Sequence, residues 1–276
     1  NNLKQAMLPV GGTVFENNHG TAPGAALEKN GKCVIILPGP PGELVPMFNE
    51  RARGFLKKYS DGAIVSHTVN IIGMGESSVA EEIEDMFDAK NPTVAPYAKS
   101  GEVRLRITAK AETADEADKM CAPVVDEICS RLGDVVYGTD MNSIEERVVA
   151  LLKEKGKKIA TAESCTAGYI PKRLTDIPGA SEVFECGIVS YSNDIKTKLL
   201  GVSPKTLETY GAVSEQTARE MALGAKHVSG ADIVISTTGL AGPGGDSVLP
   251  GGLSFAAVTD GERTVVEKIV TGHEND

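Results

Sequence analysis

From residue 143 onward, short β-branched segments alternate with segments of helical periodicity, and this alternation restricts the fold more than any other feature of the chain. The expected strands are 158–162, 183–191 and 231–239, and the expected helices begin at Ser143, Asp194, Ser203 and Ser214. Two further strand-like segments, 253–260 and 264–271, flank Asp260-Gly261 and predict a final hairpin. Strands and helices in alternation are typical of a layered α/β domain.

Residues 66–136 carry a second pattern, in which strands and helices form a smaller module. The expected elements are a strand at 66–73, a helix at 76–87, a strand at 102–111, a helix at 113–132 and a short strand at 135–136. Along 102–111, Val103, Leu105 and Ile107 alternate with polar residues, which predicts a strand with one buried face. We expect a compact α+β module with a scaffolding or pairing role, because its acidic helices disfavour RNA binding.

The first 60 residues contain short apolar segments that glycine and proline interrupt. Residues 33–37 are β-branched, follow the turn signal Asn30-Gly31 and end at Pro38, so they predict a buried strand. We expect a tight loop at 39–42 and a helix at 43–58, where apolar residues recur at helical spacing.

The charge balance and the length of the apolar segments exclude several classes of protein. Lysine plus arginine number 28 against 38 aspartate plus glutamate, a formal net charge of −10, which disfavours a surface that coats nucleic acid. No apolar segment approaches the about 18 residues that span a bilayer, and no charged-then-apolar leader opens the sequence. We therefore expect a cytoplasmic protein that binds neither membrane nor, directly, nucleic acid.

Cysteine and histidine usage indicates that the chain has no metal site. The five cysteines are odd in number and form no CxxC pair, which favours reduced thiols over disulfides or structural zinc. The four histidines lie in distant segments, so a histidine-rich metal centre is not expected.

Ser164 lies where the strand 158–162 gives way to a helix, and Pro171 is expected to kink that helix or restrict its first turn. Such a junction places a hydroxyl near unsatisfied backbone N–H groups and the positive end of the helix dipole. If Ser164 attacks an acyl carbon, those N–H groups can stabilise the oxyanion. Taken alone, the local sequence favours the simpler interpretation that Ser164 caps the helix. Cys165 is the adjacent rival nucleophile.

A catalytic serine needs a base, and the distant histidines make a Ser-His-Asp triad a weak interpretation. A lysine can replace histidine when burial lowers its pKa. The segment GIVSYSNDIK offers Tyr191 at a strand end and Lys196 in a helical turn begun by Asn193 or Asp194, and both can face one cleft. The alternative interpretation is an aromatic residue at the edge of the core and an exposed helical charge.

A glycine-rich loop follows the strand 231–239. Its glycines are at positions 239, 242, 244, 245, 251 and 252. Loops at the carboxyl ends of strands in α/β sheets are where ligands usually bind, and glycine allows backbone to approach a ligand closely. The loop lacks the GxxxxGK[ST] pattern of a P-loop.

These segments together resemble a known family. TAESCTAGYI, LTDIPGASEVFECGIVSYSNDIK, LLGV, GAVSEQTAREMA and TTGLAGPGG are similar, in this order, to the C-terminal amidase domain of the CinA, or competence/damage-inducible, family. The resemblance implies deamidation of nicotinamide mononucleotide to nicotinic acid mononucleotide and ammonia, in the salvage of pyridine nucleotides, without a cofactor.

The same resemblance implies roles for individual residues. Ser164 is the nucleophile, Lys196 its proton acceptor and Tyr191 an assisting hydroxyl. Thr238 corresponds to an active-site threonine of the family, and the following loop cradles the substrate. The implied substrate-binding residues are Thr166, Thr238, Gly239, Gly242, Gly244 and Gly245.

The upstream segments also resemble this family. NNHGTAPG and LPGPPGE are similar to the end of its molybdopterin-binding-like domain, and GMGESSVAEEI and GEVRLRITA to its KH-like linker domain. We therefore expect an incomplete α/β domain at 1–62, a KH-like α+β domain at 63–140 and the layered α/β amidase domain at 141–276. The amidase domain is expected to stop before the active-site arginine and closing helix of the family.

Two alternative functions stay open at this point. The first is an ADP-ribose pyrophosphatase, with which the N-terminal domain of the family is associated, and a divalent cation is expected if that domain is complete. Its candidate nucleotide site consists of Asn18, Thr21, Pro38, Gly39 and Glu43. The second is a non-enzymatic interaction protein linked to competence or DNA damage.

For the protein as a whole we expect a small-molecule nucleotide substrate and a homodimer.

Overall fold

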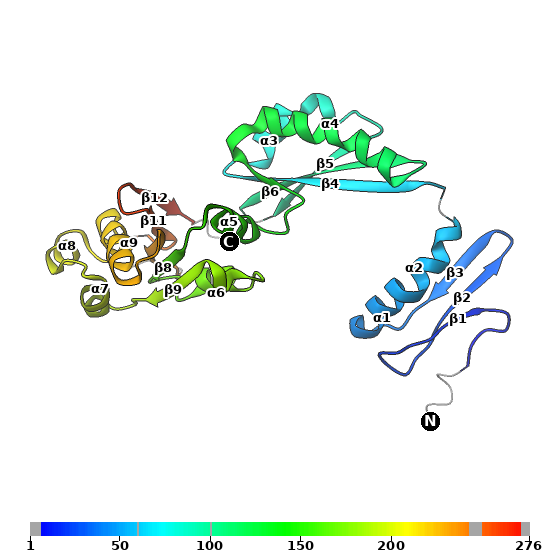
Figure 1. Cartoon of the computed structure of the whole chain (residues 1–276), viewed down its shortest axis with the longest axis horizontal. Helices are drawn as coiled ribbons and strands as arrows, with labels where there is room; N and C mark the ends of the chain where they lie inside the picture. Colours follow the sequence, from blue (N-terminus) through cyan, green and yellow to red (C-terminus); the bar gives the residue numbers. More distant parts are fainter. Residues whose placement is uncertain (1–6, 60, 100, 243–249, 272–276) are drawn as a thin grey trace. The chain divides into compact units, whose positions relative to one another are not determined.

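The computed structural model describes residues 7–59, 61–99, 101–242 and 250–271 (Figure 1). The chain divides into two compact units, one formed by residues 1–67, 77–97 and 105–131 and the other by 68–76, 98–104 and 132–276. Within the described residues, no helix has both the length and the apolar character needed to cross a membrane.

The N-terminal part consists of a small sheet and a helical segment. The strands β1 (Thr13–Phe15), β2 (Gly24–Lys29) and β3 (Lys32–Ile36) form an antiparallel sheet in that order. The helical segment comprises α1 (Pro41–Met47), the π-helix η2 (Phe48–Ala52), α2 (Arg53–Leu56) and the 3-10 helix η3 (Lys57–Tyr59). Phe15 and Ala26 of the sheet pack against Met47 and Ala52 of the helices.

The helix predicted at 43–58 and the strand predicted at 33–37 are confirmed, but the expected burial of that strand was wrong for one of its faces. In β3, Val34 and Ile36 are 60% and 53% exposed, whereas Cys33 and Ile35 pack against the core. The β-branched sequence does form a strand, but the described helices cover one face of the sheet, and successive side chains point to opposite faces.

The KH-like region contains a sheet with the strand order β5-β6-β4-β7. Its elements are β4 (Ala63–Ile72), α3 (Glu76–Glu82), η4 (Glu84–Met86), β5 (Thr93–Lys99), β6 (Glu102–Ala111), α4 (Ala114–Leu132), η5 (Gly133–Val135) and β7 (Val136–Thr139). The predicted alternation in β6 is confirmed, because Val103, Leu105 and Ile107 are all buried. Strand β5 was not predicted.

The C-terminal domain contains a mixed five-stranded sheet with the order β12-β11-β10-β8-β9. Three neighbouring strands are parallel, because β8 pairs with both β10 and the edge strand β9. On the other side, β11 pairs antiparallel with β10, and β12 pairs antiparallel with β11. The strands are β8 (Ile159–Glu163), β9 (Phe184–Val189), β10 (Ile233–Gly239), β11 (Leu253–Thr259) and β12 (Thr264–Val270). The predicted hairpin is confirmed, since β11 and β12 flank residues 260–263.

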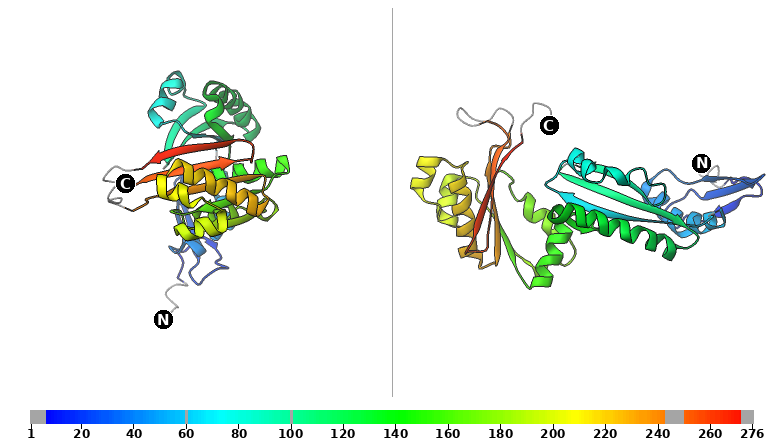
Figure 2. Two further views of the ribbon diagram at one scale, coloured as in Figure 1. Left: turned by 90° about the vertical axis from the view of Figure 1, so that its left-hand side faces the viewer. Right: turned by 90° about the horizontal axis from the view of Figure 1, so that it is seen from above.

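Helices cover both faces of this sheet, as expected of a layered α/β domain (Figure 2). The helices are α5 (Ile144–Lys155), α6 (Tyr169–Thr175), α7 (Asn193–Leu200), α8 (Pro204–Tyr210) and α9 (Glu215–Ser229), with the 3-10 turn η6 (Ala180–Glu182). On one face Ala160 and Ala162 of β8 pack against Met221 of α9. On the other face Ile159 packs with Leu152 of α5.

Serine side chains begin three of these helices. The predicted caps Ser143 and Ser214 are confirmed, since each hydroxyl accepts the N–H of the residue three positions on, at 3.3 and 3.2 Å. Helix α7 begins at Asn193, one of its two predicted starts, but neither Asn193 nor Asp194 is its cap. Ser192 is the cap, and its hydroxyl accepts the N–H of Ile195 at 3.3 Å.

Candidate active site

Three neighbouring parallel strands bring their carboxyl ends together at one edge of the C-terminal sheet. Because β8 lies between β10 and β9, Ser164 after β8 lies between Thr238 near the end of β10 and Ser190-Tyr191 after β9. Helix α7 starts directly beyond this edge and carries Lys196. Ligands bind at such edges of α/β sheets.

A pocket of about 380 Å³ opens at this edge. It is lined by Ser164, Tyr191, Lys196, Thr238, Gly239 and Gly242, all of which the sequence predicted, together with Cys165 and the short segments 212–213 and 240–241. The sequence analysis did not assign Ala212 and Val213 to the site. The sequence feature that could have indicated them is their position directly before the helix cap Ser214. Among the residues that the structure describes, no histidine lines this pocket.

Ser164 and Lys196 form a buried pair inside this pocket. Lys196 Nζ lies 2.9 Å from Ser164 Oγ, and the two residues are 1% and 8% exposed. The interpretation of Lys196 as an exposed helical charge was therefore wrong. Burial lowers the pKa of the Lys196 ammonium below the usual lysine range, because charge is costly away from water, although nearby Cys165 opposes this shift.

Two backbone carbonyls orient the amine. Lys196 Nζ donates to the carbonyl oxygens of Ser190 at 2.9 Å and of Tyr191 at 3.1 Å. A neutral amine has two N–H donors and one lone pair. When both donors are held by carbonyls, the lone pair faces the remaining neighbour, the hydroxyl of Ser164.

Ser164 itself lies in a turn before the next helix rather than in the helix. Helix α6 starts at Tyr169 and its N-cap is Gly168, so the interpretation of Ser164 as a helix cap was wrong. The Ser164 N–H donates to the carbonyl of Thr237 at 3.0 Å, and its own carbonyl accepts the N–H of Ala167 at 3.2 Å. The Ser164 hydroxyl is thus available to Lys196.

Cys165 lines the same pocket but is a poorer nucleophile than its position suggests. Burial raises the pKa of its thiol, which reduces the thiolate fraction at neutral pH. The neighbouring backbone N–H groups of Cys165 and Thr166 and the charge of Lys196 lower this pKa and partly offset the effect of burial.

The other predicted residues occupy distinct positions around the pair. Tyr191 is 75% exposed at the pocket, so it is not a residue at the edge of the core. Thr238 is buried, and its hydroxyl donates to the carbonyl of Ala212 at 2.6 Å. Thr166 is not among the lining residues; its hydroxyl lies 2.7 Å from that of Thr237.

The glycine-rich loop contributes its first part to the pocket. Gly239 has no room for a side chain, because a Cβ there would lie 2.5 Å from Ser254 Cβ and 2.8 Å from the Leu253 carbonyl oxygen. Gly242 has open space around it. Gly244 and Gly245, which were also predicted to bind substrate, lie outside the described residues.

The residues predicted for an N-terminal nucleotide site are only partly brought together. Glu43 lies against the loop 17–22, but it accepts its hydrogen bond from Asn17 Nδ2 at 2.5 Å rather than from Asn18. Asn18 and Thr21 are exposed on this loop. Near the start of α1, Pro38 is buried and Gly39 is exposed.

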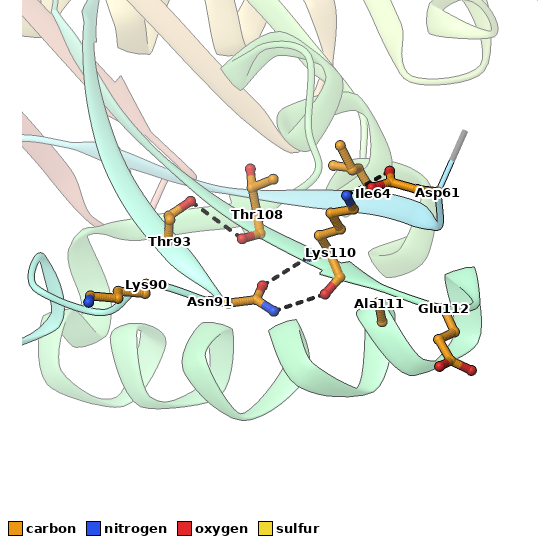
Figure 3. Close-up of a pocket in the computed structure, with 9 residues that line it drawn as sticks. All are labelled: Asp61, Ile64, Lys90, Asn91, Thr93, Thr108, Lys110, Ala111 and Glu112. Carbon is orange, nitrogen blue, oxygen red and sulfur yellow. Dashed lines mark hydrogen bonds and ion pairs between the residues drawn. The ribbon is translucent and has the colours of Figure 1, made fainter. Parts of the chain in front are cut away.

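A larger hollow, of about 580 Å³, lies in the KH-like region beside β5 and β6 (Figure 3). Several of its polar groups are bonded to one another. The Asn91 amide pairs with both backbone groups of Lys110 at 2.8 and 2.9 Å, Lys110 Nζ lies 2.7 Å from Asp61, and the Thr93 hydroxyl donates to the Thr108 carbonyl. These contacts stabilise the edge of the sheet. The pocket at Ser164 is therefore the better candidate for a catalytic site.

The described fold and site define an α/β protein in which a buried serine–lysine pair lies at the carboxyl end of a sheet. Residues 141–276 match the family model of the CinA C-terminal domain, and residues 66–138 match that of the damage-inducible protein CinA KH domain. The chain belongs to the CinA family of competence/damage-inducible proteins. The α/β class and the KH-like module are thereby confirmed, while the exact domain boundaries stay predictions.

Named relatives share this membership. A competence-damage inducible protein of Clostridium beijerinckii is 53% identical over 278 aligned residues, which cover 100% of this chain and 68% of that protein. A CinA-like protein of Desulfovibrio desulfuricans is 49% identical over 94% of this chain and 61% of its own length. The competence/damage inducible protein CihA from Agrobacterium tumefaciens, whose crystal structure is known, has 42% sequence identity to this chain. The matched region covers 46% of this chain and 79% of that protein's chain, with a TM-score of 0.45.

Proposed function

We propose that the C-terminal domain is an amidohydrolase that converts nicotinamide mononucleotide to nicotinic acid mononucleotide and ammonia. One observation carries the reaction class: Lys196 Nζ lies 2.9 Å from Ser164 Oγ, within hydrogen-bond reach, inside a pocket. The substrate follows from the resemblance of this domain to the amidase domain of the family. A carboxamide carbon is the group that an activated serine attacks.

The first half of the reaction transfers the acyl group to the serine. Neutral Lys196 takes the proton of the Ser164 hydroxyl while Oγ bonds to the carboxamide carbon, which becomes tetrahedral. We assign the stabilisation of the oxyanion to the backbone N–H groups of Cys165 and Thr166, because these residues form the turn directly after Ser164. Such a donor contributes about 3 kcal/mol in studied hydrolases. Lys196 then returns the proton to the departing nitrogen, and ammonia leaves.

The second half releases the acid. A water molecule gives its proton to Lys196 and attacks the ester carbon, and the proton returns to Ser164 Oγ as the ester bond breaks. The apolar segments 212–213 and 240–241 offer a wall for the pyridine ring, and exposed Tyr191 offers an aromatic face or hydroxyl at the pocket.

The assay that tests this function measures ammonia released by the full-length protein from nicotinamide mononucleotide, with ADP-ribose in parallel. We expect one ammonia for each nicotinic acid mononucleotide formed, because hydrolysis of a carboxamide releases both in equal amounts. Free nicotinamide is the matched control for the contribution of the ribose phosphate. Release of AMP from ADP-ribose without release of ammonia would favour the pyrophosphatase instead.

The value of kcat/KM is expected to rise with pH and then to level off, as it does when one group must lose its proton. Lys196 must be neutral to take a proton, and burial lowers its pKa, so kcat/KM should increase tenfold per pH unit below that pKa and level off above it. The plateau should begin below the usual lysine pKa of about 10.4. A kcat/KM profile from pH 5 to 10 checks this, and a limb centred at the usual lysine value would contradict it.

A further inference from the structure

A second buried titratable group, Glu163, lies directly beside the nucleophile but on the opposite face of the sheet. It is the last residue of β8, its side chain is fully buried, and strand alternation directs it away from the face where Ser164 meets Lys196. Its carboxylate accepts the Thr161 hydroxyl at 3.3 Å. Among the described residues, no ion pair to Glu163 is found, although buried carboxylates usually have a cationic partner.

The remaining contacts of Glu163 are with the backbone that follows Ser164. Its Oε2 accepts the N–H groups of Gly168 and Ile170, both at 3.2 Å. These contacts complete the start of α6, because Tyr169 donates to a carbonyl of the turn at 2.9 Å and Pro171 has no N–H. Removing the carboxylate leaves two backbone donors of this segment without their acceptor.

The turn between Ser164 and α6 has a backbone conformation that needs such support. Ala167 has φ +49° and Gly168 has φ +95°, two successive residues in the left-handed region. L-residues with a side chain avoid this region, so the turn forms only where its surroundings hold it. Two hydrogen bonds, one between Ser164 and Thr237 and one between Thr166 and Thr237, hold its other side, toward β10.

We infer that Glu163 is a positioning residue that holds this turn and thereby keeps Ser164 Oγ 2.9 Å from Lys196 Nζ. Glu163 acts as an acceptor of backbone N–H groups and takes no part in proton transfer. The inference rests on the proposed function of Ser164. A displacement of the reacting atom by about 1 Å is enough to lower a rate about 100-fold.

The test compares Glu163→Ala with Glu163→Gln. Glutamine keeps one carbonyl oxygen, and one oxygen accepts both N–H groups in the native structure. The readout is the rate at which a fluorophosphonate probe labels Ser164, forming an Oγ–P bond and releasing fluoride, alongside kcat and KM for nicotinamide mononucleotide. We expect Glu163→Ala to lower the labelling rate and kcat about 100-fold with little change in KM, and Glu163→Gln to stay within about tenfold of wild type.

Glu220→Ala is the matched control. Glu220 also accepts a backbone N–H, that of Ser203 at 2.7 Å, and a hydroxyl, that of Thr206 at 2.6 Å, at the start of α8. It should lower the melting temperature without slowing the labelling of Ser164. Equal slowing by Glu220→Ala and Glu163→Ala would assign Glu163 to general stability and overturn the inference.

Two further outcomes separate this inference from the proposed function. Loss of labelling in Glu163→Gln as large as in Ser164→Ala would make the carboxylate itself part of the chemistry, and this result decides the question even if Glu163→Ala does not fold. If the probe labels Ser164 normally but nicotinamide mononucleotide is not hydrolysed, the proposed substrate fails, while the labelling rates still test the role of Glu163. If wild type is not labelled, both proposals fail.

Discussion

Ser164→Ala is expected to lower the turnover of nicotinamide mononucleotide by a factor of about 10⁴ to 10⁶, the range seen when the nucleophile of a serine hydrolase is removed. The protein should fold normally, because the bonds of residue 164 to Thr237 and Ala167 use backbone atoms that alanine retains. Ammonia release and the melting temperature, measured on the same preparation, check both parts of this expectation. Turnover above about a tenth of wild type would exclude Ser164 as nucleophile.

Cys165→Ala is the control for Ser164→Ala. The two residues are adjacent and both line the pocket, but burial raises the pKa of the Cys165 thiol and so disfavours the reactive thiolate. We expect kcat to stay within about threefold of wild type, since the backbone N–H groups of the turn remain in place. A loss as large as that of Ser164→Ala would reverse the assignment of the nucleophile.

Lys196→Met is expected to cost turnover by a factor of about 10³ to 10⁵, because the described lining of the pocket offers no other amine, imidazole or carboxylate to take the proton of Ser164. Methionine fills a similar volume but leaves the Ser190 and Tyr191 carbonyls without their donor. Lys196→Arg should be equally inactive, since an arginine stays charged and cannot accept a proton. Substantial turnover by either variant would contradict the serine–lysine mechanism.

The Lys196→Met variant should also differ from wild type in how its stability depends on pH. The pKa of Lys196 is lowered in the folded state, so between that value and about 10.4 the unfolded chain binds more protons than the folded one. Wild-type stability therefore gains a contribution from Lys196 as pH rises through this window, and the contribution is complete above it. In Lys196→Met this rise should be absent, which melting temperatures measured between pH 7 and 10 will show.

Much of the fold could be predicted because local patterns and tertiary packing agree. The two-residue alternation in β6 matches its buried and exposed faces, and serine caps mark the starts of α5 and α9. Strand β5 escaped prediction because it contains Pro96 and has weak alternation. Its place in the sheet depends on pairing with distant residues, which a local pattern does not contain.

The candidate site was predictable in composition but not in its supporting contacts. Ser164 and Tyr191 could be named because each follows or ends a predicted strand, and Lys196 because it lies in the next predicted helical turn. Thr238 was named from the resemblance to the CinA family, and the pocket brings all four together. The burial of Lys196 could not be predicted, because a lysine in a short polar helix is usually solvated. Glu163 gave no local signal either, since its partners are backbone N–H groups that a particular turn presents.

The two carbonyl oxygens that hold the Lys196 amine belong to the main chain, at residues 190 and 191. Substitution at either position changes a side chain but leaves its carbonyl in place, provided that the path of the backbone from β9 into α7 is preserved. Most point mutations at these two positions therefore leave the hydrogen-bond acceptors of this amine unchanged. Sequences that diverge at both positions can inherit the same proton acceptor through the course of the polypeptide alone.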